Sequence, residues 1–216
     1  MANLGTAYNR IAGQNLERLA ALSDGIFAVA MTLLVLDLHA PVADAIHSER
    51  GLAHALLALA PRVLIYAMSF LTLGIFWSGQ QTQLNHFDRT DRNLSWIHLA
   101  FLLAVTTMPF STVLLGEFIT YRLALLVYWF NILLLGVTLL WSWHYASHND
   151  MMKADVSVET RNALLRRVVI AQSLYALGLA LCLINTYVSI GFIVLVQLNY
   201  AIDPLACFAS RRAASS

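Results

Sequence analysis

Residues 18–38, RLAALSDGIFAVAMTLLVLDL, decide the fold of this chain because they are long and apolar enough to form one membrane-crossing helix. A helix needs about 20 predominantly apolar residues to span a ~30 Å hydrocarbon core. The stretch opens with polar residues, including Ser23 and Asp24, and then runs apolar with one hydroxyl in its middle, Thr32. The sequence therefore predicts a first membrane helix over residues 18–39.

One face of this helix has an unusual composition. At ~100° per residue, Gly25, Val29, Thr32 and Leu36 fall on one narrow stripe, with Leu33 at its edge. A stripe that is apolar except for a single hydroxyl suits the lining of a dry and narrow pore. It suits a helix packed inside a bundle equally well. Spacing alone leaves both interpretations open.

The rest of the chain is also apolar. Its 216 residues are 59% hydrophobic and only 12% charged, with a mean hydropathy of +0.68, whereas soluble domains carry about 25% charged residues. This composition predicts an integral membrane protein. The net charge of +1, without a basic block, gives no sign of a nucleic-acid partner. Cys182 and Cys207 lie in apolar runs, which predicts buried thiols.

Hydropathy predicts an all-α polytopic protein with six transmembrane helices in a single domain over residues 1–216. The expected helices are residues 18–39, 52–79, 94–115, 121–143, 164–184 and 187–209. Pro109 is expected to kink the third helix. Residues 1–14 are too polar for a signal peptide.

The placement of basic residues predicts the orientation in the membrane. With the N-terminus inside, only three basic residues fall outside: Arg50, Arg62 and Arg122. Ten fall inside: Arg10, Arg18, Arg89, Arg92, Lys153, Arg161, Arg166, Arg167, Arg211 and Arg212. Both termini are therefore expected in the cytoplasm. The compact loops fit a bacterial inner membrane.

Motifs for catalysis or for metal binding are missing from the sequence. There is no nucleophile elbow, HExxH or CxxC, so we expect neither an enzyme nor a cofactor. His144 and His148 are four residues apart but have no nearby carboxylate or thiol, which favours an interfacial helix end over a metal site. The chain also lacks a TVGYG-like filter and an arginine-rich voltage sensor.

Charged residues near the first helix allow more than one interpretation. Arg18 and Asp24 are six residues apart, too far for a contact one turn away, so we look for their partners on another helix or another copy. Alternatively, Ser23 or Asp24 caps a helix or lies in the membrane interface. Acidic residues at the outer end either attract cations or are solvated loop charges: Asp37, Asp44 and Glu49.

The pattern Arg18-x-x-x-Leu22-Ser23-Asp24-Gly25 is similar to the RxxxFSDG signature of the transmembrane protein 175 family. This family includes the lysosomal potassium channel and its bacterial relatives. The following FAVAMTLLVLDL is typical of the family's first helix. The resemblance is strongest over residues 16–117 and extends to three further segments: GIFW at 74–77, DRNL at 91–94 and PFSTVLLGE at 109–117.

This resemblance implies a homotetramer in a lipid bilayer, with one six-helix unit per chain and four first helices around a central pore. Family members conduct K⁺ through apolar side-chain rings without a carbonyl filter. At matching positions, Val29, Leu33 and Leu36 would form the constriction and gate, and Thr32 a hydroxyl ring for selectivity. A structural polar network would hold the first helix against its neighbours: Arg18, Ser23 and Asp24.

Three departures from the family pattern bear on these roles. Leu22 replaces the usual Phe, and Val29 is smaller than the Ile or Leu common at the first ring. Gln80 and Gln81 stand where relatives often have two histidines. The resemblance implies a cation channel with modest selectivity for K⁺ over Na⁺. The alternative is a proton-coupled secondary transporter, or a proton-conducting membrane protein, that uses the Arg18/Asp24 cluster.

Overall fold

The computed structural model describes residues 15–43 and 46–213, with side chains up to residue 201. Within this range the chain is helical apart from turns, loops and one isolated bridge between Phe87 and Met152. The predicted all-α class is confirmed. The expectations for residues 1–14, for Asp44 and for the thiol of Cys207 lie outside what is described.

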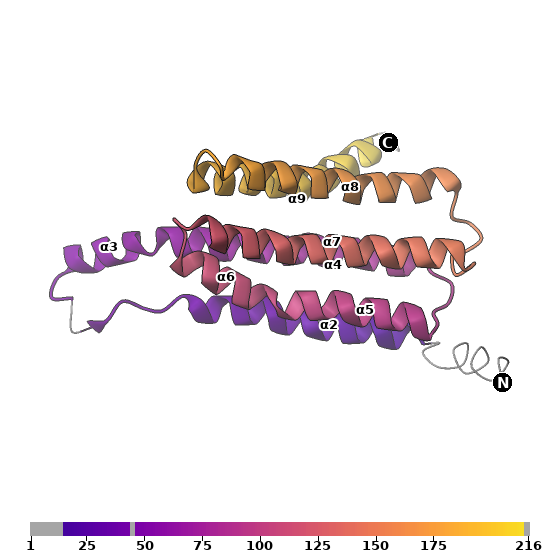
Figure 1. Ribbon diagram of the computed structural model, residues 1–216, viewed down its shortest axis with the longest axis horizontal. Coiled ribbons are helices and arrows are strands. Elements are labelled where there is room, and N and C mark those ends of the chain that lie inside the picture. The colour runs from indigo at the N-terminus through magenta and orange to yellow at the C-terminus, as the bar shows by residue number, and fades with distance from the viewer. Residues whose placement is uncertain (1–14, 44–45, 214–216) are drawn as a thin grey trace.

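The helices follow one another along the chain: α2 (Leu16–Leu33), η1 (Leu34–Asp37), α3 (Glu49–Ala58), α4 (Ala60–His86), α5 (Arg92–Thr106), α6 (Met108–Glu117), α7 (Arg122–His148), α8 (Val158–Leu181) and α9 (Thr186–Ala213). Five spans in the described part of the chain are long and apolar enough to cross a membrane, and Thr186–Ala201 adds a shorter apolar helix. In Figure 1, α2 and α5 lie in one layer, α4 and α7 in the next, and α8 and α9 in a third.

The second expected helix differs most from the structure. It is divided at Leu59 into α3, which has no buried residue and extends past the bundle in Figure 1, and α4. Pro61 lies in the first turn of α4, where a missing N–H costs no hydrogen bond. Helix α4 ends at His86, beyond the expected end at residue 79. Its last turns carry polar residues such as Gln80 and Gln83, which the hydropathy pattern does not attribute to a span but which are buried between helices.

The third expected helix is also divided, at Thr107, into α5 and α6. Pro109 has no N–H, and its ring clashes with the carbonyl four residues earlier, so the helix cannot continue straight. Thr107 Oγ1 contacts the Ala104 carbonyl at 2.9 Å and Asn131 Oδ1 at 3.2 Å. Instead of a kink, the helix has a break at Thr107, two residues before the proline. Asn131 on α7 supplies a polar partner for the Thr107 hydroxyl.

Buried aromatic rings join α2, α4 and α5. The ring centroid of Phe101 lies 5.9 Å from that of Phe27 and 6.5 Å from that of Phe76. All three side chains are buried, so they fix the distance between the layers of the bundle.

A buried polar cluster joins α4, α6, α7 and α9. The hydroxyl of Tyr128 contacts Ser69 Oγ at 3.2 Å and Thr72 Oγ1 at 3.3 Å. Thr112 Oγ1 donates to Ser69 Oγ, and Gln197 Nε2 donates to Thr72 Oγ1. Interhelical hydrogen bonds of this kind hold helices together where lipid removes most of the hydrophobic driving force.

Candidate functional site: the exposed face of helix α2

Helix α2 has two faces of different character. Its buried side chains recur every three or four residues and pack against the rest of the bundle. They are Leu19, Ser23, Phe27, Ala30 and Leu34. The orientation of α2 within the chain is therefore fixed by one apolar face that also carries a serine.

The opposite face contains the predicted pore residues, and all of them lie on the surface of the protomer. The exposed fraction is 57% for Val29, 45% for Leu33 and 67% for Leu36, and Thr32 is exposed beside them. The helix tightens to a 3₁₀ turn over residues 34–37, and side chains three residues apart eclipse in such a turn. Leu36 therefore lies nearly above Leu33.

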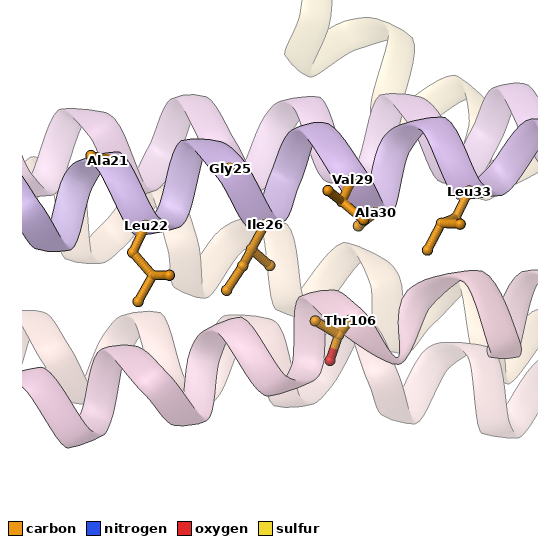
Figure 2. A pocket seen from close by; sticks show the side chains of 8 residues that line it. All are labelled: Ala21, Leu22, Gly25, Ile26, Val29, Ala30, Leu33 and Thr106. Atoms are coloured by element: carbon orange, nitrogen blue, oxygen red, sulfur yellow. The ribbon is translucent and has the colours of Figure 1, made fainter.

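A shallow apolar groove accompanies this face. It has a volume of about 430 Å³ and lies between α2 and α5, where Thr106 contributes its single hydroxyl-bearing side chain (Figure 2). In Figure 2, Leu22 and Ile26 extend from α2 toward α5. The other lining residues are Ala21, Gly25, Val29, Ala30 and Leu33. The Leu22 that departs from the family pattern thus lies on this exposed surface and not in the protomer core.

The hydroxyl of Thr32 bonds to its own helix. Oγ1 lies 2.8 Å from the Val29 carbonyl and 3.0 Å from the Ala28 carbonyl, so its proton is directed back to the backbone. A hydroxyl has one proton and two lone pairs. No described residue donates to Thr32 Oγ1, so its lone pairs remain able to accept, and the residue lies on the exposed side of the helix.

Asp24 is held by two donors from α4. Its Oδ1 accepts from Trp77 Nε1 at 2.8 Å and from Gln81 Nε2 at 2.6 Å. Hydrogen bonds to an ionised carboxylate are roughly twice as strong as neutral ones. Gln81, one of the two positions that depart from the family pattern, therefore serves as a partner of the signature aspartate.

Ser23 begins a buried chain of polar contacts across four helices. Gln80 Nε2 donates to Ser23 Oγ at 2.8 Å and lies 3.4 Å from His98 Nδ1. The other ring nitrogen of His98 lies 3.2 Å from Ser142 Oγ on α7. All four side chains are buried, and Gln80 Oε1 has no hydrogen-bond partner among the described residues.

Arg18 does not share these contacts. Its backbone N–H bonds the capping Asn15, while its exposed guanidinium has no hydrogen bond or ion pair within the described residues. Of the three residues expected to form a polar network, Ser23 and Asp24 thus contact α4 and Arg18 does not. Within one protomer, Arg18 and Asp24 are not an ion pair.

The end of α2 opposite Arg18 has its own charges. Arg62 at the start of α4 forms an ion pair of 2.9 Å with Glu117 at the end of α6. Asp37 lies beside this pair, because a methyl group placed on Gly116 would be 3.5 Å from its Oδ2. Glu49 is exposed at the start of α3. Near the end of the exposed stripe, one positive side chain therefore meets two negative ones: Arg62 with Glu117 and Asp37.

The histidine pair of α7 is a surface feature in which the two rings are in contact at a tilt of 40°. The rings of His144 and His148 have centroids 4.0 Å apart, and His148 Nδ1 lies 2.9 Å from the carbonyl of His144. In the described part of the chain, no three side chains that commonly bind metals come together.

The sequence did not identify the residues that support α2: Trp77, Gln80, Gln81, His98 and Ser142. A usable signal was present only at residues 80 and 81, where two amides follow an apolar run and depart from the family pattern. Polar residues near a predicted span end are usually solvated. Only the fold shows that these lie opposite the signature Ser-Asp pair.

A bundle of membrane-length helices whose outer faces are apolar defines a multi-pass membrane protein. Comparison with known proteins gives its family. The profile of the family described as "Endosomal/lysosomal potassium channel TMEM175" matches residues 18–109. A protein named potassium channel from Streptomyces collinus is 30% identical over 194 residues, which cover 86% of this chain and 91% of that protein. The chain belongs to this family, which consists of ion channels and not of enzymes.

Two further similarities extend this result. The crystal structure of a "lysosomal potassium-selective channel TMEM175 homolog" from Chamaesiphon minutus has a TM-score of 0.76 and 27% sequence identity, and the match covers 87% of this chain and 97% of that one. The human "Endosomal/lysosomal proton channel TMEM175" is 24% identical over 184 residues, which are 84% of this chain and 36% of that protein. The fold is therefore that of a TMEM175 channel, and the chain is a multi-pass cation channel.

Proposed function

We propose that four copies of this chain surround a central axis with their α2 helices and conduct K⁺, with a modest preference over Na⁺. The exposed stripe of α2 carries the proposal. Val29, Leu33 and Leu36 are large apolar side chains left uncovered by their own protomer. Around a symmetry axis, each would face its counterparts in the other copies.

The same stripe would serve as the gate. Rings of Val29, Leu33 and Leu36 that meet on the axis would exclude water and block ions by dewetting. The 3₁₀ turn supports a continuous constriction, because it sets Leu36 nearly above Leu33. Opening would require the four helices to splay or rotate.

Thr32 would supply the selectivity. Because its hydroxyl proton is directed to the Val29 and Ala28 carbonyls, four such oxygens could offer lone pairs to a partly dehydrated ion. K⁺ loses its hydration shell more readily than Na⁺, so a ring of hydroxyls favours K⁺. A single level of four oxygens is less than the stacked levels of a carbonyl filter, and we expect modest selectivity.

Relatives support two permeant ions. The matched proteins from Streptomyces collinus and Chamaesiphon minutus are named potassium channels, and the human relative is named a proton channel. The second candidate function is therefore proton conduction. It would not use an Arg18–Asp24 ion pair within one protomer, since Arg18 makes no contact with Asp24.

The basic residues at the start of α2, between α4 and α5, and in α8 lie toward one end of the bundle (Figure 1). By the positive-inside rule, this end would face the cytoplasm of a bacterium, with both termini there.

Recordings from the purified protein in planar bilayers test the proposal. We expect single-channel steps whose reversal potential follows the K⁺ gradient when K⁺ and Na⁺ oppose each other. A reversal potential that follows an imposed proton gradient instead would favour the second function. Native mass spectrometry should give four times the protomer mass of 24.0 kDa. A monomer, or saturable flux without steps, would contradict a pore built from four α2 helices.

A further inference from the structure

A second cavity lies on the side of the bundle away from α2. It has a volume of about 480 Å³ and is lined by α4, α7, α8 and α9. This volume is within the range of about 300–1,000 Å³ that small-molecule sites occupy. Along α4 the lining runs from Phe70 to Gln83, which corresponds to about 20 Å of helix. The cavity is therefore long enough to hold much of an extended acyl chain.

Most of the wall is apolar or aromatic. Phe70 and Phe76 come from α4 and Tyr175 from α8, and Gly74 leaves open space because a methyl group there would meet no atom within 4 Å. Such a wall suits a hydrocarbon chain and excludes water.

Arg167 gives the cavity a positive charge that no described residue neutralises. Its guanidinium carbon lies 5.7 Å from the centroid of the Tyr200 ring, and among the described residues it has no ion pair. None of the described side chains that line the cavity is acidic. Helix side chains lean toward the start of their helix, so Arg167 leans toward the membrane surface at which α8 begins. Charged groups in membrane bundles usually pair, and none of the described side chains supplies an anion for Arg167.

Two amides among the lining residues have unused acceptors. Gln83 is 3% exposed, and its Nε2 donates to the Leu139 carbonyl at 3.2 Å. Gln172 Nε2 contacts the Ile132 carbonyl in the same way at 3.4 Å. The Oε1 atoms of both residues are buried and have no hydrogen-bond partner among the described residues. Buried acceptors without a donor indicate an occupant that donates hydrogen bonds.

We propose that this cavity binds one anionic glycerophospholipid with a hydroxylated head group, of the phosphatidylglycerol type. The phosphate pairs with Arg167, a head-group hydroxyl donates to Gln83 Oε1, and one acyl chain lies along the wall formed by Phe70 and Phe76. Basic pockets between membrane helices bind anionic head groups in this way. The site contains no residue of the α2 stripe, so the inference does not depend on which ion the channel conducts.

Native mass spectrometry of the purified full-length protein tests the charge. The probes are dioleoyl-phosphatidylglycerol and dioleoyl-phosphatidylcholine, which share acyl chains. One basic side chain near an anionic lipid surface corresponds to a preference of roughly fivefold. We expect Arg167→Gln to lose this preference and Arg166→Gln to keep it, because both arginines are exposed but only Arg167 lines the cavity. Equal loss in both variants, or no preference in the wild type, would overturn the proposal.

A second pair of variants tests the location. Gly74→Leu fills the cavity from a position where the new side chain meets open space, whereas Gly191→Leu adds the same bulk outside the cavity at an equally open position. We expect Gly74→Leu to lose the tightly bound phosphatidylglycerol and Gly191→Leu to retain it, with unchanged helical content by circular dichroism. Wild-type binding in folded Gly74→Leu would place the lipid elsewhere and refute the site.

Discussion

Replacing Ser23 with alanine tests how the bundle holds α2. Ser23 and Gln80 are both completely buried, and Gln80 Nε2 donates to Ser23 Oγ at 2.8 Å. Without this acceptor, the amide retains only the 3.4 Å contact to His98. A buried donor left without its partner costs about 1–3 kcal/mol. We therefore expect Ser23→Ala to lower the free energy of unfolding by about that amount.

Replacing the other partner should cost less. Gln80→Leu removes the donor together with Oε1, an acceptor that already lacks a partner. The remaining Ser23 hydroxyl can donate to the Leu19 carbonyl one turn back, as Thr32 donates to Ala28. We expect Gln80→Leu to cost less than about 1 kcal/mol, and the double variant to cost no more than Ser23→Ala alone, because two apolar groups can replace a bonded pair at little cost.

Reversible unfolding of the purified protein with sodium dodecyl sulfate in mixed micelles measures these free energies. The matched control is Ser173→Ala, because Ser173 is exposed and its hydroxyl bonds only the Val169 carbonyl of its own helix. The free energy of unfolding of this control should stay within about 0.5 kcal/mol of the wild-type value. If Ser23→Ala is no worse than the control, or Gln80→Leu is the more damaging change, the reasoning about the stranded amide is wrong.

Three further variants probe the stripe and the packing. Thr32→Ala should bring K⁺ and Na⁺ permeabilities closer, read as the reversal potential under opposing gradients; unchanged selectivity would remove Thr32 from that role. Leu36→Ala should raise the leak current through the closed state several-fold. Leu195→Ala is the matched control, because Leu195 is 66% exposed and Leu36 is 67% exposed, and it should leave the leak current unchanged. Equal leak currents in both variants would contradict the gate. Gly136→Ala places a methyl group against the Gln172 amide and should lower stability by about 1 kcal/mol. Adding Gln172→Ala should restore the lost stability, which thermal unfolding of the double variant measures.

Helical periodicity predicted the faces of α2 well because both depend on the same angle of rotation per residue. The stripe through Val29 and Leu36 is on the surface, and Phe27, on the other side, is buried. Periodicity could not predict whether another copy of the chain covers the stripe. The number of copies and their axis are properties of an assembly, and one chain's spacing carries no direct record of them.

The helix ends and the supporting contacts were harder to predict for a common physical reason. Hydropathy treats each polar residue as a preference for water, yet the amide nitrogen of Gln80 donates to a serine 57 positions away. The end of α4 was placed too early for this reason. Nothing in the local pattern distinguishes a solvated amide from one that bonds another helix, so Trp77 and Gln81 gave no sign of their bonds to Asp24.

The distribution of polar contacts along α2 bears on how the proposed channel would open. The described side-chain hydrogen bonds from α2 to other helices are made by Ser23 and Asp24, both in its first half. Beyond Ala30 the helix is held through apolar contacts such as that of Leu34, which are non-directional and tolerate sliding. Motion that keeps the Ser23 and Asp24 bonds while displacing Leu36 would cost least. On the proposed function, α2 therefore pivots near its signature residues, and the constriction at Leu36 widens more than the level of Val29.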